Sequence, residues 1–187
     1  MTEASFFKVR LYVVIAVIIA IESLLAWNYA HGGIPRHHIL ADKDLPEISN
    51  AWGGLLLPLL AWFLTWRIQK RVFHHIESGT EVNMRPVLYS FAGSLLYATT
   101  MAVSFSFGYN VIINNMMLGI FVIALFFPVY RSECLLGFVL GMTVTLGAVL
   151  PTGVGTIICV ITAVLYLGVR RGVLYVVGRV GQKRVTG

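Results

Sequence analysis

The most evident shortage in this sequence is of charge. Only 12% of the 187 residues are charged and 58% are hydrophobic, whereas a soluble domain has about 25% charged and about 45–50% apolar residues. The mean hydropathy is accordingly high, at +0.82. The apolar residues also form repeated runs of about 20 residues, which is the length that spans a lipid bilayer. The composition therefore predicts an integral membrane protein.

Cysteine and the common catalytic motifs are also scarce. Cys134 and Cys159 are the only two cysteines, and they form no CxxC pair, so neither a disulfide framework nor a zinc knuckle is expected. The chain contains no glycine-rich phosphate loop, no GxSxG elbow and no HExxH pair. These absences exclude the usual signatures of nucleotide-binding proteins, serine hydrolases and zinc proteases.

The apolar runs predict an all-α integral membrane protein with six transmembrane helices in a single polytopic domain over residues 1–187. A tight turn is predicted at Pro151, Thr152 and Gly153, just before the sixth span. Pro58 interrupts the second and shortest span. The predicted spans are about 9–27, 52–66, 87–107, 111–130, 135–150 and 152–169.

The positions of the basic residues predict the orientation. With both termini in the cytoplasm, all 14 basic residues except Arg36 and Lys43 fall on the cytoplasmic side, as the positive-inside rule requires. We therefore predict a plasma membrane protein (the inner membrane of a bacterium) with a long first outer loop and a basic cytoplasmic tail over 170–187. Contact of these residues with anionic lipids accounts for the net charge of +6 without a nucleic acid partner.

Glu22 is an acid inside the first predicted span. It lies about 10 Å below the outer interface marked by Tyr29, at about 1.5 Å per helical residue. An ionised carboxylate that faces lipid costs several kcal/mol, so Glu22 must be neutral, paired or exposed to a polar cavity. We interpret it as a proton- or cation-binding group, and the alternative is a packing residue. On another face of this helix, Ala16 and Ala20 are small enough for a partner helix to approach closely.

The first outer loop contains most of the remaining candidate site residues. Imidazole and carboxylate groups together suit a divalent metal such as Zn²⁺, Mn²⁺ or Fe²⁺, and the same groups could titrate at about pH 6 as a gate. The alternative is a solvated polar loop without a site. The candidate metal ligands are His31, His37, His38, Asp42 and Asp44, and the wider binding site adds Glu22, Glu47 and Asn50.

Two further patterns indicate contacts between helices. Hydroxyl side chains and one methionine recur on one face of the third predicted span, where hydrogen bonds to neighbouring helices are favoured over a polar path. Glycines in the fifth predicted span indicate close helix packing. The residues of the first pattern are Ser90, Ser94, Tyr97, Met101 and Ser104, and those of the second are Gly137, Gly141 and Gly147.

Three functions remain open from the sequence. The favoured one is membrane transport, or capture of a solute or ion, at an outward-facing site formed by the first outer loop and Glu22. The second is a metal-assisted hydrolase or transferase that acts on a lipid or lipid-linked substrate at the outer leaflet, with Glu22 or Glu47 as general base. The third is a non-catalytic assembly subunit. In each case we expect the lipid bilayer and a homo-oligomer or membrane partner subunit as partners, and no nucleic acid.

Overall fold

The computed structural model describes residues 3–33, 36–38, 47–74 and 83–185, with side chains throughout except at 36–38, 47–48, 74 and 170–185. The described chain is helical apart from two three-residue strands, β1 (Arg36–His38) and β2 (Glu47–Ser49), and a short 3-10 turn, η2 (Asn50–Trp52). The helices are α1 (Glu3–Ala30), α2 (Gly53–His74), α3 (Arg85–Ser106), α4 (Asn110–Phe126), α5 (Ser132–Leu146) and α6 (Val149–Val185).

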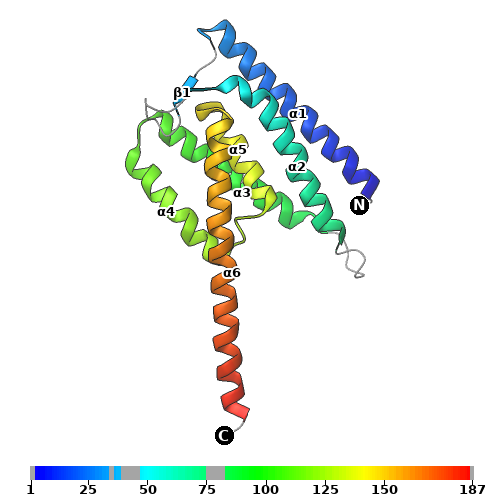
Figure 1. Ribbon diagram of the computed structural model, residues 1–187, viewed down its shortest axis with the longest axis vertical. Helices are drawn as coiled ribbons and strands as arrows, with labels where there is room; N and C mark the ends of the chain where they lie inside the picture. Colours follow the sequence, from blue (N-terminus) through cyan, green and yellow to red (C-terminus); the bar gives the residue numbers. More distant parts are fainter. Residues whose placement is uncertain (1–2, 34–35, 39–46, 75–82, 186–187) are drawn as a thin grey trace.

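Successive helices run in opposite directions, so the N-terminus of α1 and the C-terminus of α6 lie at the same end of the bundle. We call this the termini end, and we call the opposite end, which carries β1, β2 and η2, the loop end. Figure 1 shows α6 continuing well past the other helices at the termini end. The basic segment that follows residue 169 therefore extends the last helix.

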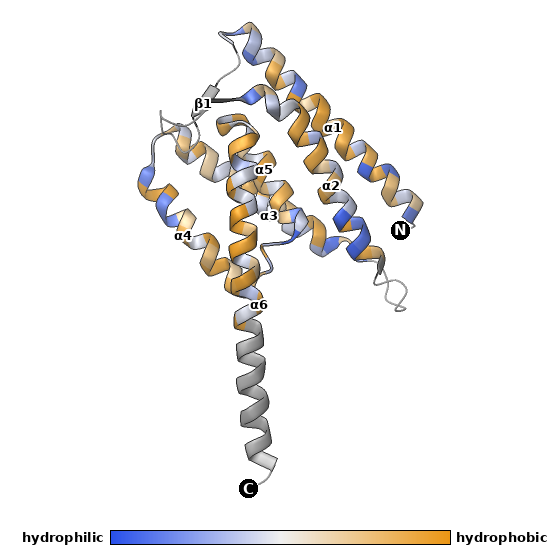
Figure 2. Cartoon of the chain, viewed as in Figure 1, coloured by the Kyte–Doolittle hydropathy of each residue, from blue (hydrophilic) through white to orange (hydrophobic). Residues whose placement is uncertain are grey.

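The described helices have the composition of a membrane protein. Four are long and apolar enough to cross a bilayer, namely Glu3–Ala30, Asn50–Phe73, Arg85–Ser106 and the Val149–Val169 part of α6. The other two, α4 and α5, are apolar but have only 17 and 15 residues. Figure 2 shows hydrophobic residues along the helices and hydrophilic ones gathered where α1 and α2 meet at the termini end.

The bundle is organised around α5, which packs on α2, α3 and α6. Helix α1 packs on α2 at one edge, and α4 packs on α3 and α6 at the other. One buried cluster joins α1, α2 and α5 and includes Val17, Leu57 and Val139. A second buried cluster joins α3, α4, α5 and α6 and includes Met101 and Phe138.

The closest approach between helices is that of α3 and α5. A Cβ on Gly141 would lie 2.7 Å from the Cβ of Ala98, and a Cβ on Gly137 would overlap the Ser94 hydroxyl and lie 2.6 Å from the carbonyl oxygen of Phe91. Small residues spaced four apart on both helices thus bring the two backbones together. The prediction of close packing at Gly137 and Gly141 is confirmed.

Several helix ends differ from the predicted spans. Helix α2 continues beyond 66 to His74, because its Arg and Lys residues are good helix formers. Helix α4 ends at Phe126, because a following proline disfavours helical backbone at Phe127. The turn predicted at Pro151, Thr152 and Gly153 is wrong. The chain turns instead at 147–148, and Pro151 lies in the first turn of α6, where its missing N–H has no helical acceptor.

Candidate functional site

Glu22 lies at the surface of α1 and faces the first turn of α2. A Cβ on Gly54 would lie 2.9 Å from Glu22 Oε1 and 3.0 Å from Leu25 Cδ1, so the carboxylate rests close to the backbone of α2 at Gly54. The first turn of a helix presents unpaired N–H groups and a positive dipole end, which favour a negative charge. Glu22, Tyr29 and Ala51 line an open groove at this place.

The alanines of α1 are also at the surface. Ala16 and Ala20 are exposed, and they lie among exposed apolar side chains such as Ile15 and Ile19. No helix in the described part of the chain packs over them. Their expected role, contact with a partner helix, stays a prediction.

A small polar cavity lies beside the Glu22 groove, between the last turns of α1, η2 and the end of α5. Its volume is about 140 Å³. Leu25 lines both the groove and the cavity, so the two are adjacent. The polar side chains of the cavity wall are Asn28, Asn50, Thr143 and Thr145, and we refer to the space they enclose as the polar cavity.

The turn between α5 and α6 closes one side of the polar cavity. Gly147 has φ 72° and ψ −176°, a backbone conformation that is essentially restricted to glycine. A Cβ at this position would also overlap the Asn50 amide. The neighbouring Ala148 packs on Gly53, where an added Cβ would lie 2.9 Å from the alanine Cβ. The turn, η2 and the start of α2 are thus held together by residues that have little or no side chain.

Two of the polar groups in the cavity wall are available for a ligand. Within the described residues, neither the Asn28 nor the Asn50 side chain has a hydrogen-bond partner, whereas the Thr143 hydroxyl donates to the carbonyl oxygen of Val139 at 2.6 Å. An amide carries both donors and an acceptor. The cavity can therefore bind a small polar solute through Asn28 and Asn50 without breaking a contact within the protein.

The candidate residues of the first outer loop are only partly described. Strands β1 and β2 are antiparallel and pair Arg36 with Ser49, His37 with Ile48 and His38 with Glu47. This register brings His38 opposite Glu47 in the ladder, and β2 leads directly into Asn50. Asp42 and Asp44 lie outside the described residues, as do the side chains of His37, His38 and Glu47.

His31 is described, and it terminates α1. Its ring stacks on Trp27 with the ring centroids 3.9 Å apart, and its Nδ1 lies 2.9 Å from the Trp27 carbonyl oxygen. The Trp27 carbonyl oxygen also accepts the His31 backbone N–H at 3.1 Å, so donation from Nδ1 adds a second hydrogen bond to this acceptor. Its Nε2 then remains as the nitrogen that could bind a metal.

Within the described residues, no three His, Cys, Asp or Glu side chains lie close enough together to hold a metal ion. The predicted site at His31, His37, His38, Asp42 and Asp44 depends on side chains of which only His31 is described. The divalent metal stays a prediction.

Two buried charges at the termini end were missed in the sequence. Arg71 Nη2 lies 2.8 Å from Glu133 Oε1, and Glu133 is fully buried with no partner for Oε2 among the described residues. Arg10 is also buried. The signal for Glu133 was an acid at the start of an apolar run. The pattern of basic residues indicates orientation but gives no sign that Arg10 and Arg71 make contacts inside the bundle.

Comparison of the chain with protein-family models, with curated proteins and with solved structures finds no match.

Proposed function

We propose that this protein is a membrane transport or solute-capture protein whose binding site is the polar cavity at the loop end. The observation that carries the proposal is the pair of amides, Asn28 and Asn50, that face an enclosed space of about 140 Å³ and have no hydrogen-bond partner in the described part of the chain. Both side chains are partly buried, and their free donors and acceptors can bind a ligand or water in the cavity.

The size and charge of the site favour a small cation or a protonatable solute. Its volume is below the range of about 300–1,000 Å³ that is typical of sites for drug-sized ligands. Glu22, in the adjacent groove, supplies a negative charge. The wall of the cavity itself is neutral and can replace part of the hydration shell of a cation. The histidines and acids of the first outer loop precede Asn50 in the chain and remain the candidate ligands for a divalent metal.

The distribution of charge supports an outward-facing site. Basic residues gather at the termini end on α1, on the last turns of α2 and at the starts of α3 and α5, as at Lys8, Arg67, Arg85 and Arg131. By the positive-inside rule this end faces the cytoplasm. The loop end and its polar cavity then face the other side of the membrane, where a capture protein meets its solute.

Cysteine labelling in intact cells tests both the orientation and the access to the site. The two native cysteines are first replaced by serine, and Thr145→Cys is introduced in the wall of the cavity. We expect a membrane-impermeant thiol reagent to modify Thr145→Cys in intact cells. The matched control is Gly168→Cys, exposed on α6 at the termini end, which should react only after permeabilisation. The reverse pattern, or an unreactive Thr145→Cys, would refute the proposed site.

The same variant tests the class of solute. Zn²⁺, Mn²⁺ and methylammonium are the probes, and a bound solute should slow the labelling of Thr145→Cys. Asn50→Leu should abolish this protection. If stoichiometric metal is bound and is lost in the His37→Ala/His38→Ala variant, the loop is part of the site. If no probe changes the rate at which Thr145→Cys is labelled, the site does not bind a cation. In that case Glu22→Gln should not change the labelling rate either.

A further inference from the structure

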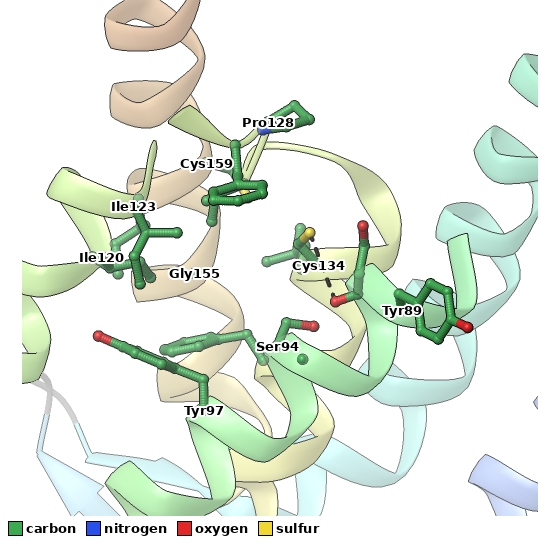
Figure 3. A pocket seen from close by; sticks show the side chains of 16 residues that line it. Tyr89, Ser94, Tyr97, Ile120, Ile123, Pro128, Cys134, Gly155 and Cys159 are labelled. Carbon is green, nitrogen blue, oxygen red and sulfur yellow. Dashed lines mark hydrogen bonds between the residues drawn. The ribbon is translucent and has the colours of Figure 1, made fainter. Parts of the chain in front are cut away.

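A second cavity, which we call the apolar pocket, lies among α3, α4, α5 and α6 (Figure 3). It shares no residue with the polar cavity. Its volume is about 390 Å³, within the range typical of ligand sites. Its wall runs from Tyr97 and Ile120, within α3 and α4, to Tyr89, Pro128 and Cys134 near the termini end. A ligand in this pocket would therefore extend along the helices.

Three polar side chains in the wall of the apolar pocket are already paired within the protein. The Ser94 hydroxyl donates to the Phe91 carbonyl oxygen at 2.9 Å, and the Tyr97 hydroxyl donates to the carbonyl oxygen of Met116. The Cys134 thiol contacts the carbonyl oxygen of Ser90 at 4.0 Å (Figure 3). No lining residue is charged. An ion or polar solute would lose its hydration in this pocket without gaining equivalent partners. A hydrocarbon chain has no such hydration to lose.

Two arginines precede, within one helical turn of chain, residues that line the termini end of the apolar pocket. Arg85 begins α3 one turn before Tyr89, and Arg131 directly precedes α5, three residues before Cys134. The neighbouring acid, Glu133, is fully buried and paired with Arg71. Arginines near the bilayer surface attract anionic lipid headgroups, and the guanidinium group matches the geometry of a phosphate.

We propose that the apolar pocket binds one acyl chain of an anionic phospholipid, with the lipid phosphate held by Arg131 and Arg85. The aromatic residues fit this depth in the membrane. Tyr130 and Tyr166 lie beside the same end, with ring centroids 5.7 Å apart, and tyrosine is enriched where the headgroups meet the hydrocarbon. The lipid would belong to the leaflet at the termini end, and the site is independent of the proposed solute site.

Lipid retention tests the proposal directly. The full-length protein is purified in mild detergent, incubated with phosphatidylglycerol or phosphatidylcholine of the same acyl chains, washed, and analysed for bound lipid by mass spectrometry. We expect about one phosphatidylglycerol to be retained per chain, and clearly less phosphatidylcholine. Arg131→Gln should reduce retention of phosphatidylglycerol towards that of phosphatidylcholine. Equal retention of the two lipids by the unaltered protein would overturn the proposal.

A matched pair of glycine variants tests whether the chain occupies this pocket. Gly93 lines the pocket, and nothing lies within 4 Å of a Cβ placed there or at Gly153, which is outside the pocket. Gly93→Leu therefore adds a side chain in the pocket wall, and Gly153→Leu adds the same side chain elsewhere. We expect Gly93→Leu to lose the retained lipid and Gly153→Leu to keep it. Retention by both variants would overturn the assigned place.

The native thiols give a readout that needs no substitution. Cys134 and Cys159 are the only cysteines in the chain, and both line the apolar pocket. Phosphatidylglycerol at about ten times its Kd should slow their modification by N-ethylmaleimide about tenfold, because only the empty fraction reacts. Equal modification rates with and without the lipid would contradict the proposal. Equal protection by palmitate would also contradict it, because a free fatty acid would then suffice.

Discussion

The guanidinium carbon of Arg10 lies 3.6 Å from the centre of the Trp62 ring, and this contact joins α1 to α2. Arg10 is only 6% exposed, and its Nη1 donates to Gln69 Oε1 at 3.3 Å. A cation over an aromatic face contributes about 2 kcal/mol or more when it is desolvated. Because α1 packs mainly on α2, this pair is a main anchor of the first helix.

The first prediction concerns this pair. Trp62→Leu should destabilise the protein by about 2 kcal/mol, because it leaves a buried cation without its aromatic partner. Adding Arg10→Met should recover part of the loss, giving a coupling energy of about 1–2 kcal/mol in a double-mutant cycle. The measurement is the free energy of unfolding in detergent. Lys70 and Trp66, with the amine 5.4 Å from the ring centre, are exposed and form the control cycle, for which we expect about 0.5 kcal/mol. Equal coupling in the two cycles would refute the anchoring role.

The second prediction concerns the ion pair between α2 and α5. Arg71→Gln leaves the fully buried Glu133 without its partner and should cost about 3–5 kcal/mol. Glu133→Gln should cost less, because the Arg71 side chain is 34% exposed and can turn towards solvent. The double variant should be more stable than Arg71→Gln alone. The same unfolding measurement decides the order of the three variants, and equal losses for the two single variants would contradict the account.

These two pairs show why sequence reasoning stopped where it did. The helices were predictable, because long apolar runs have few other structures available in a bilayer. Gln69 lies 59 residues from Arg10 and Glu133 lies 62 residues from Arg71, and Trp62 is similarly distant from Arg10. No local pattern specifies such contacts. The basic residues had been assigned a sufficient role in orientation, so their contacts inside the bundle went unnoticed.

The candidate site was predictable to a similar degree. Asn50 was included in the predicted site, and the structure places it in the wall of the polar cavity. The packing of Glu22 against Gly54 was not foreseen, because it depends on how α1 crosses α2 and not on either helix alone. The turn before α6 was placed at Pro151, since proline is a common turn residue. The decisive signal was Gly147, whose backbone conformation few other residues can adopt.

The third prediction concerns the contact between α3 and α5. Gly141→Ala should cost about 1–3 kcal/mol, because its Cβ would lie 2.7 Å from the Ala98 Cβ and 2.9 Å from the Leu95 carbonyl oxygen. Gly93→Ala is the matched control, since nothing lies within 4 Å of its Cβ. This change should be neutral or stabilise the helix by up to about 1 kcal/mol. Similar unfolding free energies for the two variants would show that the two helices are less closely packed than the structure describes.

The last prediction concerns Gly147 and Asn50, which close the polar cavity. Gly147→Ala introduces both an unfavourable backbone conformation and an overlap with the Asn50 amide. Gly108→Ala is the control, because Gly108 also has φ 72° but nothing lies within 4 Å of its Cβ. We expect Gly108→Ala to cost about 1–2 kcal/mol and Gly147→Ala to cost clearly more.

A second substitution separates the two terms at Gly147. Asn50→Ala removes the overlapping amide, so the Gly147→Ala/Asn50→Ala variant should recover stability relative to Gly147→Ala, and the cost of the backbone conformation at position 147 should remain. Access to the polar cavity should change together with stability. Labelling of Thr145→Cys should change in Gly147→Ala, where the amide is displaced, and remain unchanged in Gly108→Ala. Recovery of stability without any change in labelling would mean that the turn maintains the fold but does not shape the cavity.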